Sequence, residues 1–333
     1  MSDTIHLTLS AAQDLLTHGF QAAGVPASTA TSVAQALTLA QAEGQAGHGF
    51  SRFESYAAQA KSGKVDAVAQ PVMTLQGAAV VHVDAQLGFA YPAIDLALDR
   101  GLPLAQDTGI SVMTITRSHH CGALSMHVER IAQAGLIGLM VANTPKAMAP
   151  WGGDAAIFGT NPIAFACPCA DGPPLVIDLS LSIVARGKVM AAQKAGTPIP
   201  EGWALGPDGQ PTTDPATALK GTMVPIGGAK GSALALMVEI LAAGLTGATF
   251  SKDATSFFDA KGAPPAVGQT LIAIRPDSGF MGRVGGLLDD IAAMPGTRIP
   301  GARRQAALAE AKQNGMHVPA QLVHQVQDTI NAA

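Results

Sequence analysis

Apolar positions along the chain follow a helical spacing at first and an alternating pattern of elements later. After Ser10, and again from about Ser28 to Glu43, apolar residues recur every three or four positions, which predicts two helices. Ser10 and Gln13 fit a capping box at the start of the first helix, because each side chain can satisfy the other's free amide. Residues 44–49, G-Q-A-G-H-G, end the second helix, and their glycines allow a ligand to approach the backbone closely. A further helix is predicted to begin at Phe50.

Beyond residue 80, predicted strands and helices alternate. The expected strands are Val80–Val83, Val112–Ile115, Leu136–Val141, Ile163–Ala166, Leu175–Ile177 and Leu271–Ile274. The expected helices are Tyr91–Arg100, Ala123–Ala134, Ser180–Lys194, Leu287–Met294, Arg303–Asn314 and Ala320–Ile330, with Pro319 in the first turn of the last. The very apolar stretch Ala233–Leu245 predicts a helix that crosses the core. The alternation indicates an α/β architecture.

Composition limits the class of protein. With 333 residues, 48% of them hydrophobic and 13% charged, the chain is long enough for one or two domains with a large core. A net charge of -4 without a basic block argues against nucleic-acid binding. Cys121, Cys167 and Cys169 fit neither a disulfide framework nor a zinc knuckle. The sequence shows no signal peptide and no apolar run of membrane-spanning length, so we expect a cytoplasmic protein that does not bind membranes.

His48 is the first candidate for chemistry. A histidine can give and take a proton near neutral pH, as hydride transfer requires at the substrate oxygen or nitrogen. Arg52 lies four residues further on, so within a helix both side chains project from one face, where an arginine fork suits a carboxylate. The alternatives are a histidine that bonds a backbone carbonyl at a helix end and an arginine in a surface ion pair.

Three further segments suit an anionic ligand. His119, His120 and Gly122–Leu124 lie where a predicted strand gives way to a helix, and free N–H groups there favour a phosphate or carboxylate. A metal site is the weaker interpretation, because adjacent histidines point apart and no carboxylate follows at ligand spacing. Asp178–Ser180 end a strand, where ligands of α/β proteins usually collect. Ala229–Lys230 follow two glycines and precede a helix, as in a turn that faces phosphate.

Three arginines, Arg298, Arg303 and Arg304, flank a Pro300–Gly301 turn. Together they could cradle a pyrophosphate or the 2′-phosphate of NADP. The alternative is that they cap the last helices and face solvent. The chain has no G-x-G-x-x-G between a strand and a helix, so a nicotinamide cofactor would bind on a scaffold other than the Rossmann fold.

The segments S-H-H-C-G-A-L at 118–124 and F-G-T-N-P-I-A-F at 158–165 resemble the type-2 malate/L-lactate dehydrogenases, a family of NAD(P)-dependent oxidoreductases. The likeness extends from about Leu9 to Arg304. V-I-D-L-S-L-S at 176–182 and G-T-M-V-P-I-G-G-A-K-G-S at 221–232 look most like the branch named as (R)-3-sulfolactate dehydrogenases. Reductases of Δ1-pyrroline-2-carboxylate and Δ1-piperideine-2-carboxylate, which are cyclic ketimines, form a sister branch.

The resemblance implies a fold and a set of roles. It implies an α/β fold with a mixed-sheet, non-Rossmann cofactor domain, placed at residues 116–284, and a mainly helical substrate and dimerisation domain made of residues 1–115 and 285–333. His48 is the implied proton donor and Arg52 the substrate-binding arginine, whereas Gly47 stands where the family has a serine relay. Thr160 is the implied substrate contact. The implied cofactor contacts are His120, Cys121, Gly122, Ala123, Leu124, Asp178, Leu179, Ser180, Ala229, Lys230, Arg298, Pro300, Gly301, Arg303 and Arg304.

Lys188 remains open between two interpretations. Its A-R-G-K segment has the form common among the dehydrogenases, which makes the lysine a catalytic candidate, whereas some ketimine reductases carry an aspartate relay nearby. An exposed helix lysine without a catalytic role is the alternative. No residue is predicted to bind a metal.

We therefore predict an NAD(P)-dependent dehydrogenase of a small 2-hydroxy acid, with a carboxylate substrate. NADP is slightly favoured over NAD, because Ala302 replaces the family's usual glutamate, which would repel a phosphate. The resemblance and the low content of charged residues predict a homodimer. The alternatives are a cyclic ketimine reductase on the same scaffold and, because the serine is missing, a ligand-binding protein without catalysis.

Overall fold

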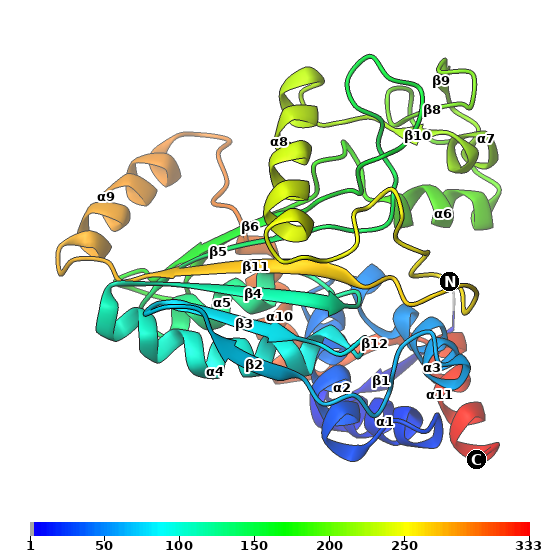
Figure 1. Ribbon diagram of the computed structural model, residues 1–333, viewed down its shortest axis with the longest axis horizontal. Coiled ribbons are helices and arrows are strands. Elements are labelled where there is room, and N and C mark those ends of the chain that lie inside the picture. The colour runs from blue at the N-terminus through cyan, green and yellow to red at the C-terminus, as the bar shows by residue number, and fades with distance from the viewer. Residues whose placement is uncertain (1–2) are drawn as a thin grey trace.

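The computed structural model describes residues 3–333, and its centre is a seven-stranded mixed sheet (Figure 1). In spatial order the strands are β2 (Val72–Leu75), β3 (Val80–Asp84), β4 (Ile110–Ser118), β11 (Val267–Ile274), β5 (Ile137–Ala142), β6 (Ile163–Cys167) and β7 (Leu175–Leu179). The β3–β4 pair is parallel and the other five pairs are antiparallel. The chain therefore has the mixed, non-Rossmann sheet that we predicted.

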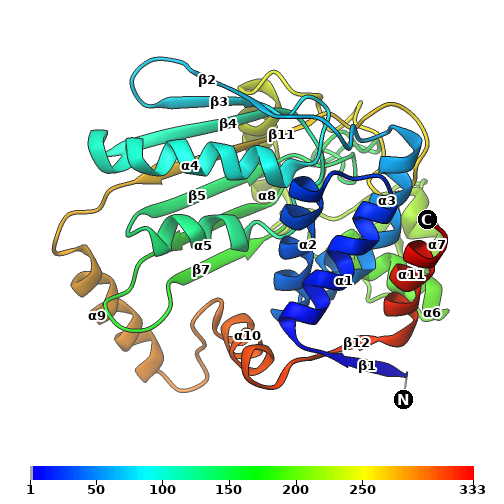
Figure 2. The same cartoon turned by 90° about the horizontal axis from the view of Figure 1, so that it is seen from below.

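Helices cover both faces of this sheet. α4 (Ala90–Thr108) and α5 (Ser125–Gln133) lie on one face, and α8 (Ala229–Glu239) lies on the other (Figures 1 and 2). Between the sheet and α4 and α5, side chains such as Ile94, Met113 and Leu271 are fully buried. The apolar runs in the sequence reflect this arrangement, because the central strands β4 and β11 are buried on both faces.

A helical layer at one end of the sheet holds a second core. Its helices are α1 (Leu9–Ala22), α2 (Ala27–Ala42), α3 (Phe53–Ser62), α10 (Ala302–Asn314) and α11 (Ala320–Asn331). Phe20, Phe53 and Tyr56 are among its largest buried side chains. Strand β1 (Thr4–Leu7) pairs antiparallel with β12 (Met316–Pro319), so a segment near each end of the chain lies in this layer (Figure 2).

A smaller unit lies beyond the α8 face of the sheet. It contains α6 (Arg186–Ala195), α7 (Pro215–Lys220) and a three-stranded sheet of β8 (Ala204–Leu205), β9 (Pro211–Thr212) and β10 (Thr222–Met223). Its small core includes Val189, Ile199 and Ala218. The domain boundary that we predicted between residues 115 and 116 falls inside β4, so one continuous strand crosses it.

Several element predictions need correction. Thr8, not Ser10, caps α1, because its hydroxyl accepts a hydrogen bond from the Ala11 N–H at 3.2 Å. The predicted helix from Ser180 begins only at Arg186, since residues 181–183 instead hydrogen-bond to residues 224–226. α4 continues past the predicted end at Arg100 to Thr108. Pro319 ends β12 and directly precedes α11 rather than lying within its first turn.

The apolar stretch at 233–245 does not cross the core as predicted. α8 and the following π-helical turn, Ile240–Gly244, lie on the surface of the sheet. Ala235 and Val238 point inward and are fully buried, whereas Leu234, Leu236 and Met237 are 42%, 49% and 42% exposed. α9 (Phe280–Ala293) projects from the body (Figures 1 and 2), and within the described chain none of its residues is buried.

Among residues 3–333, no helix combines the length and apolar character needed to cross a membrane.

Candidate active site

The segment that carries His48 and Arg52 is not an α-helix, so helical spacing does not place the two side chains on one face. Two 3-10 turns, Ala46–His48 and Phe50–Arg52, precede α3. The Arg52 side chain folds back, and its Nε donates a hydrogen bond to the main-chain oxygen of Gly47 at 2.7 Å. Only 9% of Arg52 is exposed. Arg52 and the 47–48 turn are thus joined by a hydrogen bond rather than by helical spacing.

The His48 ring is stacked on the ring of His120. The ring centroids are 5.4 Å apart and the planes differ by 13°. Nδ1 of His48 is buried, and no atom in residues 3–333 forms a hydrogen bond with it. Burial of the ring and the nearby Arg52 cation lower the pKa of His48 to about 3. The imidazole is therefore neutral at physiological pH and able to accept a proton.

Both tyrosines of the chain lie behind His120, and the sequence analysis missed them. The Tyr56 hydroxyl forms a short hydrogen bond with His120 Nδ1 and lies 3.3 Å from the Tyr91 hydroxyl. Burial raises the pKa of Tyr56 to about 12, so both hydroxyls remain protonated. An added Cβ at Gly122, whose φ is +71°, would lie 2.7 Å from the Tyr91 hydroxyl. Glycine is therefore required where the 120–124 segment passes Tyr91.

Thr160 is held by a buried polar network. Its main-chain N–H donates to Thr144 Oγ1 at 2.9 Å. The next residue, Asn161, has a φ of 39° and donates from Nδ2 to Glu239 Oε2 at 2.8 Å. Glu239 also accepts two hydrogen bonds from Ser251, each 2.6 Å long. This network fixes the turn that carries Thr160, because each of its buried acceptors has donors.

Most of the predicted cofactor residues gather around the end of β7. Asp178 accepts a hydrogen bond from the Ser125 N–H at the start of α5, at 2.8 Å. Gly301 packs beside the same strand, where an added Cβ would lie 2.7 Å from the Val176 oxygen. Residues 120–124 are buried, whereas Asp178 and Leu179 are exposed. The exposed surface of this region therefore lies on its β7 side.

The loop before α8 reaches the same place. The Ile226 N–H donates to the Leu181 oxygen at 2.8 Å, and the Ile183 N–H donates to the Val224 oxygen at 2.9 Å. These hydrogen bonds join residues 181–183, which follow Leu179 and Ser180, to residues 224–226, which precede Ala229 and Lys230. Leu179, Ile183 and Ile226 expose 41%, 47% and 42% of their surfaces. This apolar surface beside a strand end and a helix start fits a dinucleotide.

Arg304 departs from the exposed arginine cluster that we predicted. Its guanidinium is buried and forms ion pairs with Glu43 and with Glu129, the latter at 2.7 Å. Burial is the main cause that raises the pKa of Glu43 to about 7. Arg298 and Arg303 are exposed, as a phosphate-binding pair would be. Arg304 instead joins α10 to α2 and α5.

Lys188, the other catalytic candidate, lies at the surface of the small unit. It is exposed in the first turn of α6, and its Nζ has no hydrogen-bond partner among the described residues. Residues 3–333 also contain no group of three His, Cys, Asp or Glu side chains placed to hold a metal ion. The arrangement around His48, Arg52 and His120 therefore offers a proton carrier and a cation, which is the chemistry needed at the carbonyl end of a carboxylate substrate.

Comparison with known proteins places this site in a family. The malate/L-lactate dehydrogenase family matches residues 7–327. The chain is 47% identical over 323 residues to the (2R)-3-sulfolactate dehydrogenase (NADP(+)) of Chromohalobacter salexigens, covering 96% of each chain. It is 40% identical over 329 residues to a Δ1-pyrroline-2-carboxylate/Δ1-piperideine-2-carboxylate reductase of Pseudomonas putida, covering 96% of this chain and 95% of that protein.

Solved structures show the same fold. The chain superimposes on the Δ1-piperideine-2-carboxylate reductase of Pseudomonas syringae pv. tomato with a TM-score of 0.93 and 37% identity, covering 98% of this chain and 100% of the other. The sulfolactate dehydrogenase of Methanocaldococcus jannaschii gives a TM-score of 0.90 at 29% identity, with 98% and 97% coverage.

The chain belongs to the malate/L-lactate dehydrogenase family. It is an NAD(P)-dependent oxidoreductase of small 2-hydroxy and 2-oxo acids. The resemblance, the fold class and the enzyme class predicted from the sequence are thereby confirmed.

Proposed function

We propose that the chain is an NADP-dependent dehydrogenase with (2R)-3-sulfolactate as its first candidate substrate, in which His48 exchanges the proton and Arg52 holds the carboxylate. The observation that carries the proposal is the state of the Arg52 side chain. Nε is fixed on Gly47, and no atom of residues 3–333 accepts a hydrogen bond from either Nη. A buried guanidinium with both NH2 groups unused beside a neutral histidine suits a carboxylate and its neighbouring carbonyl.

When bound, a nicotinamide cofactor supplies or accepts the hydride. In oxidation, the neutral His48 takes the proton of the substrate hydroxyl. In reduction, it returns a proton to the carbonyl oxygen. Arg52 orients the substrate, and Thr160 is the proposed third contact because its turn is fixed by Asn161 and Glu239. The stack of His48 on His120 holds the imidazole in place without the family's serine.

Substrate binding should change the charge balance at His48. The Arg52 cation helps to lower the pKa of His48 in the free enzyme. Burial is the larger cause and persists when substrate binds, but a carboxylate bound to Arg52 offsets the positive charge and favours the protonated form of His48 relative to the free enzyme.

The proposal of NADP over NAD rests on two observations. The relative with 47% identity is named for NADP(+). Arg298 and Arg303 are exposed near a turn that packs on β7, and no acidic residue lies between Arg298 and Arg303. These arginines are the residues proposed to hold the 2′-phosphate.

A cyclic ketimine reductase is the second candidate. It is favoured by the 40% identity to the Pseudomonas putida reductase and by the TM-score of 0.93 to the piperideine-2-carboxylate reductase. Both substrate types carry a carboxylate beside the carbon that receives hydride. Arg52 and His48 therefore suit either.

A substrate panel separates the candidates. The enzyme is assayed with 3-sulfopyruvate, oxaloacetate, pyruvate, Δ1-pyrroline-2-carboxylate and Δ1-piperideine-2-carboxylate, each with NADPH and NADH. The highest kcat/KM is expected for 3-sulfopyruvate with NADPH. A preference for either cyclic imine favours the second candidate, and no turnover with bound NADPH favours the binding protein considered in the sequence analysis.

We also propose a homodimer. Within the described chain no residue of α9 is buried. Its apolar side chains Met281 and Leu287 are 41% and 59% exposed. The outer side of α8 exposes Leu234, Leu236 and Met237. Several large apolar side chains exposed on two helices are the basis of this proposal. A monomer at micromolar concentration by light scattering would contradict the proposal. A cytoplasmic location also remains a proposal, which cell fractionation tests.

A further inference from the structure

A loop remote in sequence, residues 255–263, lies against the Arg52 side of the site. It joins the region after α8 to strand β11 (Figure 1). Phe258 is part of this loop, and its ring centroid lies 4.7 Å from Arg52 Cζ. Phe258 is 39% exposed, whereas Arg52 is 9% exposed. The guanidinium carbon therefore lies over an aromatic ring, an arrangement that is favourable for a cation.

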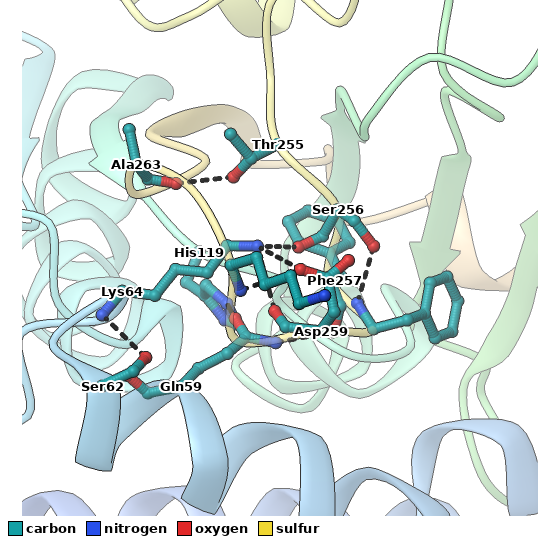
Figure 3. Close-up of polar contacts among 11 residues, drawn as sticks. Gln59, Ser62, Lys64, His119, Thr255, Ser256, Phe257, Asp259 and Ala263 are labelled. Atoms are coloured by element: carbon teal, nitrogen blue, oxygen red, sulfur yellow. Dashed lines mark hydrogen bonds and ion pairs between the residues drawn. The ribbon is translucent and has the colours of Figure 1, made fainter.

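Lys64 holds this loop in place through hydrogen bonds. The lysine follows α3, its side chain is 1% exposed, and its Nζ donates to the Ser256 oxygen at 2.7 Å and to the Asp259 oxygen at 3.0 Å (Figure 3). Asp259 Oδ1 lies 3.4 Å from the same Nζ. These acceptors satisfy a buried ammonium group, whose exposure to an apolar environment would otherwise be costly. They bracket Phe257 and Phe258 on both sides.

Gln59 makes the second connection. Its Nε2 donates to the Phe257 oxygen at 2.8 Å, and its Oε1 accepts a hydrogen bond from His119 Nε2 at 2.6 Å (Figure 3). The Phe257 ring packs against both neighbouring histidines, with centroids 5.4 Å from His119 and 5.0 Å from His120. The 255–263 loop is thus joined to the segment that stacks on His48.

Resting on the proposed function, we propose that Phe258 is a positioning and specificity-determining residue for the substrate carboxylate, and that Lys64 acts through it by fixing the 255–263 loop. Three features restrict the guanidinium: Nε donates to the Gly47 oxygen, the 3-10 turn Phe50–Arg52 carries the side chain, and the Phe258 ring lies against Cζ. The edge with the two Nη groups is left for the ligand. A carboxylate is selected because it matches that edge with two parallel hydrogen bonds.

The test uses four variants of the full-length enzyme. Phe258→Leu removes the ring, Phe258→Tyr keeps it, Lys64→Met releases the loop, and Lys61→Met is the matched control on the exposed surface of α3. Kinetics are measured with the best 2-oxo acid or imine of the panel. A second readout needs no activity: phenylglyoxal modifies guanidinium groups, and mass spectrometry gives the rate of modification at Arg52.

Phe258→Leu should raise KM about threefold to thirtyfold and leave kcat and NADPH affinity unchanged, and should speed modification of Arg52. Phe258→Tyr and Lys61→Met should have the KM and the Arg52 modification rate of the enzyme without substitutions. Lys64→Met should change both quantities as Phe258→Leu does. An unchanged KM, an unchanged modification rate, or a Tyr variant as impaired as the Leu variant overturns the proposal. If Lys64→Met does not fold, the Phe258 variants decide.

Failure of the proposed function gives a different result. In that case the enzyme without substitutions turns over no compound of the panel. The rate of phenylglyoxal modification at Arg52 then alone tests the role of Phe258. Faster modification of Arg52 in Phe258→Leu than in Phe258→Tyr then supports Phe258 as the residue that covers Arg52. Equal rates overturn it.

Discussion

Arg52 donates from Nε to the main-chain oxygen of Gly47 over 2.7 Å. Gly47, which stands where relatives are expected to have a serine, therefore contributes its main-chain oxygen to the site. Its side-chain position is open, because a Cβ added at Gly47 meets no atom of the described chain within 4 Å. Nδ1 of the adjacent His48 is buried and lacks a hydrogen-bond partner in residues 3–333. A serine is therefore sterically permitted at position 47. Nδ1 of His48 is available to its hydroxyl as a hydrogen-bond partner.

Gly47→Ser should therefore raise kcat rather than disturb the fold. One added hydrogen bond to the histidine is worth about 0.5–1.5 kcal/mol, which corresponds to roughly a twofold to tenfold change in rate. Thermal unfolding should stay at the temperature of the unmodified enzyme. Gly282→Ser on α9, another position with open space, is the control. A lower kcat in Gly47→Ser would mean that the stack on His120 already gives the better orientation.

Arg304 should matter for stability. Removing its guanidinium with Arg304→Met leaves the carboxylates of Glu43 and Glu129 without their cation, and such broken buried pairs cost about 3–5 kcal/mol. The exposed neighbour Arg303→Met should change the free energy of unfolding by no more than about 0.5 kcal/mol. Urea unfolding measures both. Equal stability of the two variants would contradict the structural role of Arg304.

Arg298 and Arg303 should matter for the cofactor. Replacing both with Ala is expected to weaken NADPH binding about tenfold, because charge-assisted hydrogen bonds to the 2′-phosphate are lost. NADH lacks that phosphate, so its dissociation constant should not change. Fluorescence titration with each cofactor measures the two constants. Equal loss for both, or loss for neither, would exclude these arginines as phosphate ligands.

The sequence indicates candidate residues of the site more readily than the contacts between them. His48 and Arg52 are candidates because their residue types and the glycines around them suit proton transfer and carboxylate binding. The helical face considered for the pair is replaced in the structure by two 3-10 turns and the Gly47 hydrogen bond. Arg304 looked like Arg303 in the sequence. Its inward direction depends on glutamates 261 and 175 residues away.

Contacts between distant segments explain what was missed. Tyr56 meets His120 across 64 residues, and Phe258 reaches Arg52 from a loop that no periodic pattern marks. The stretch at 233–245 was misplaced for a related reason. Apolar composition indicates that surface is to be buried, but it does not tell whether the chain itself or another molecule buries it.

Stability should fall as the pH is lowered from about 7 to 5. Burial, the largest cause in each case, lowers the pKa of His48 and His119 to about 3, of His127 to about 4, and of His120 well below 6.5. Below pH 6.5 the unfolded chain binds protons that the folded chain does not, so the free energy of unfolding decreases until the folded pKa values are reached. Glu43, with a pKa raised to about 7, takes up a proton in the folded chain over the same pH range. This uptake offsets the loss of stability caused by one of the four histidines.

Each uncompensated histidine contributes a slope of at most about 1.4 kcal/mol per pH unit. Urea unfolding at pH 7, 6 and 5 measures the slope, and His119→Gln should reduce it by about one proton. A flat profile would mean that the buried histidines are protonated in the folded enzyme.

The most direct test of the account is the kinetic effect of His48→Ala, measured together with NADPH affinity. Proton transfer by a positioned side chain contributes about 10²–10⁴-fold to the rate, so kcat should fall by that factor. NADPH binding should change little, because most of the proposed cofactor residues gather around β7 and the variant keeps the His120 ring that stacks on His48. A variant that retains full turnover, or one whose only defect is loss of NADPH binding, would contradict the assignment of the proton to His48.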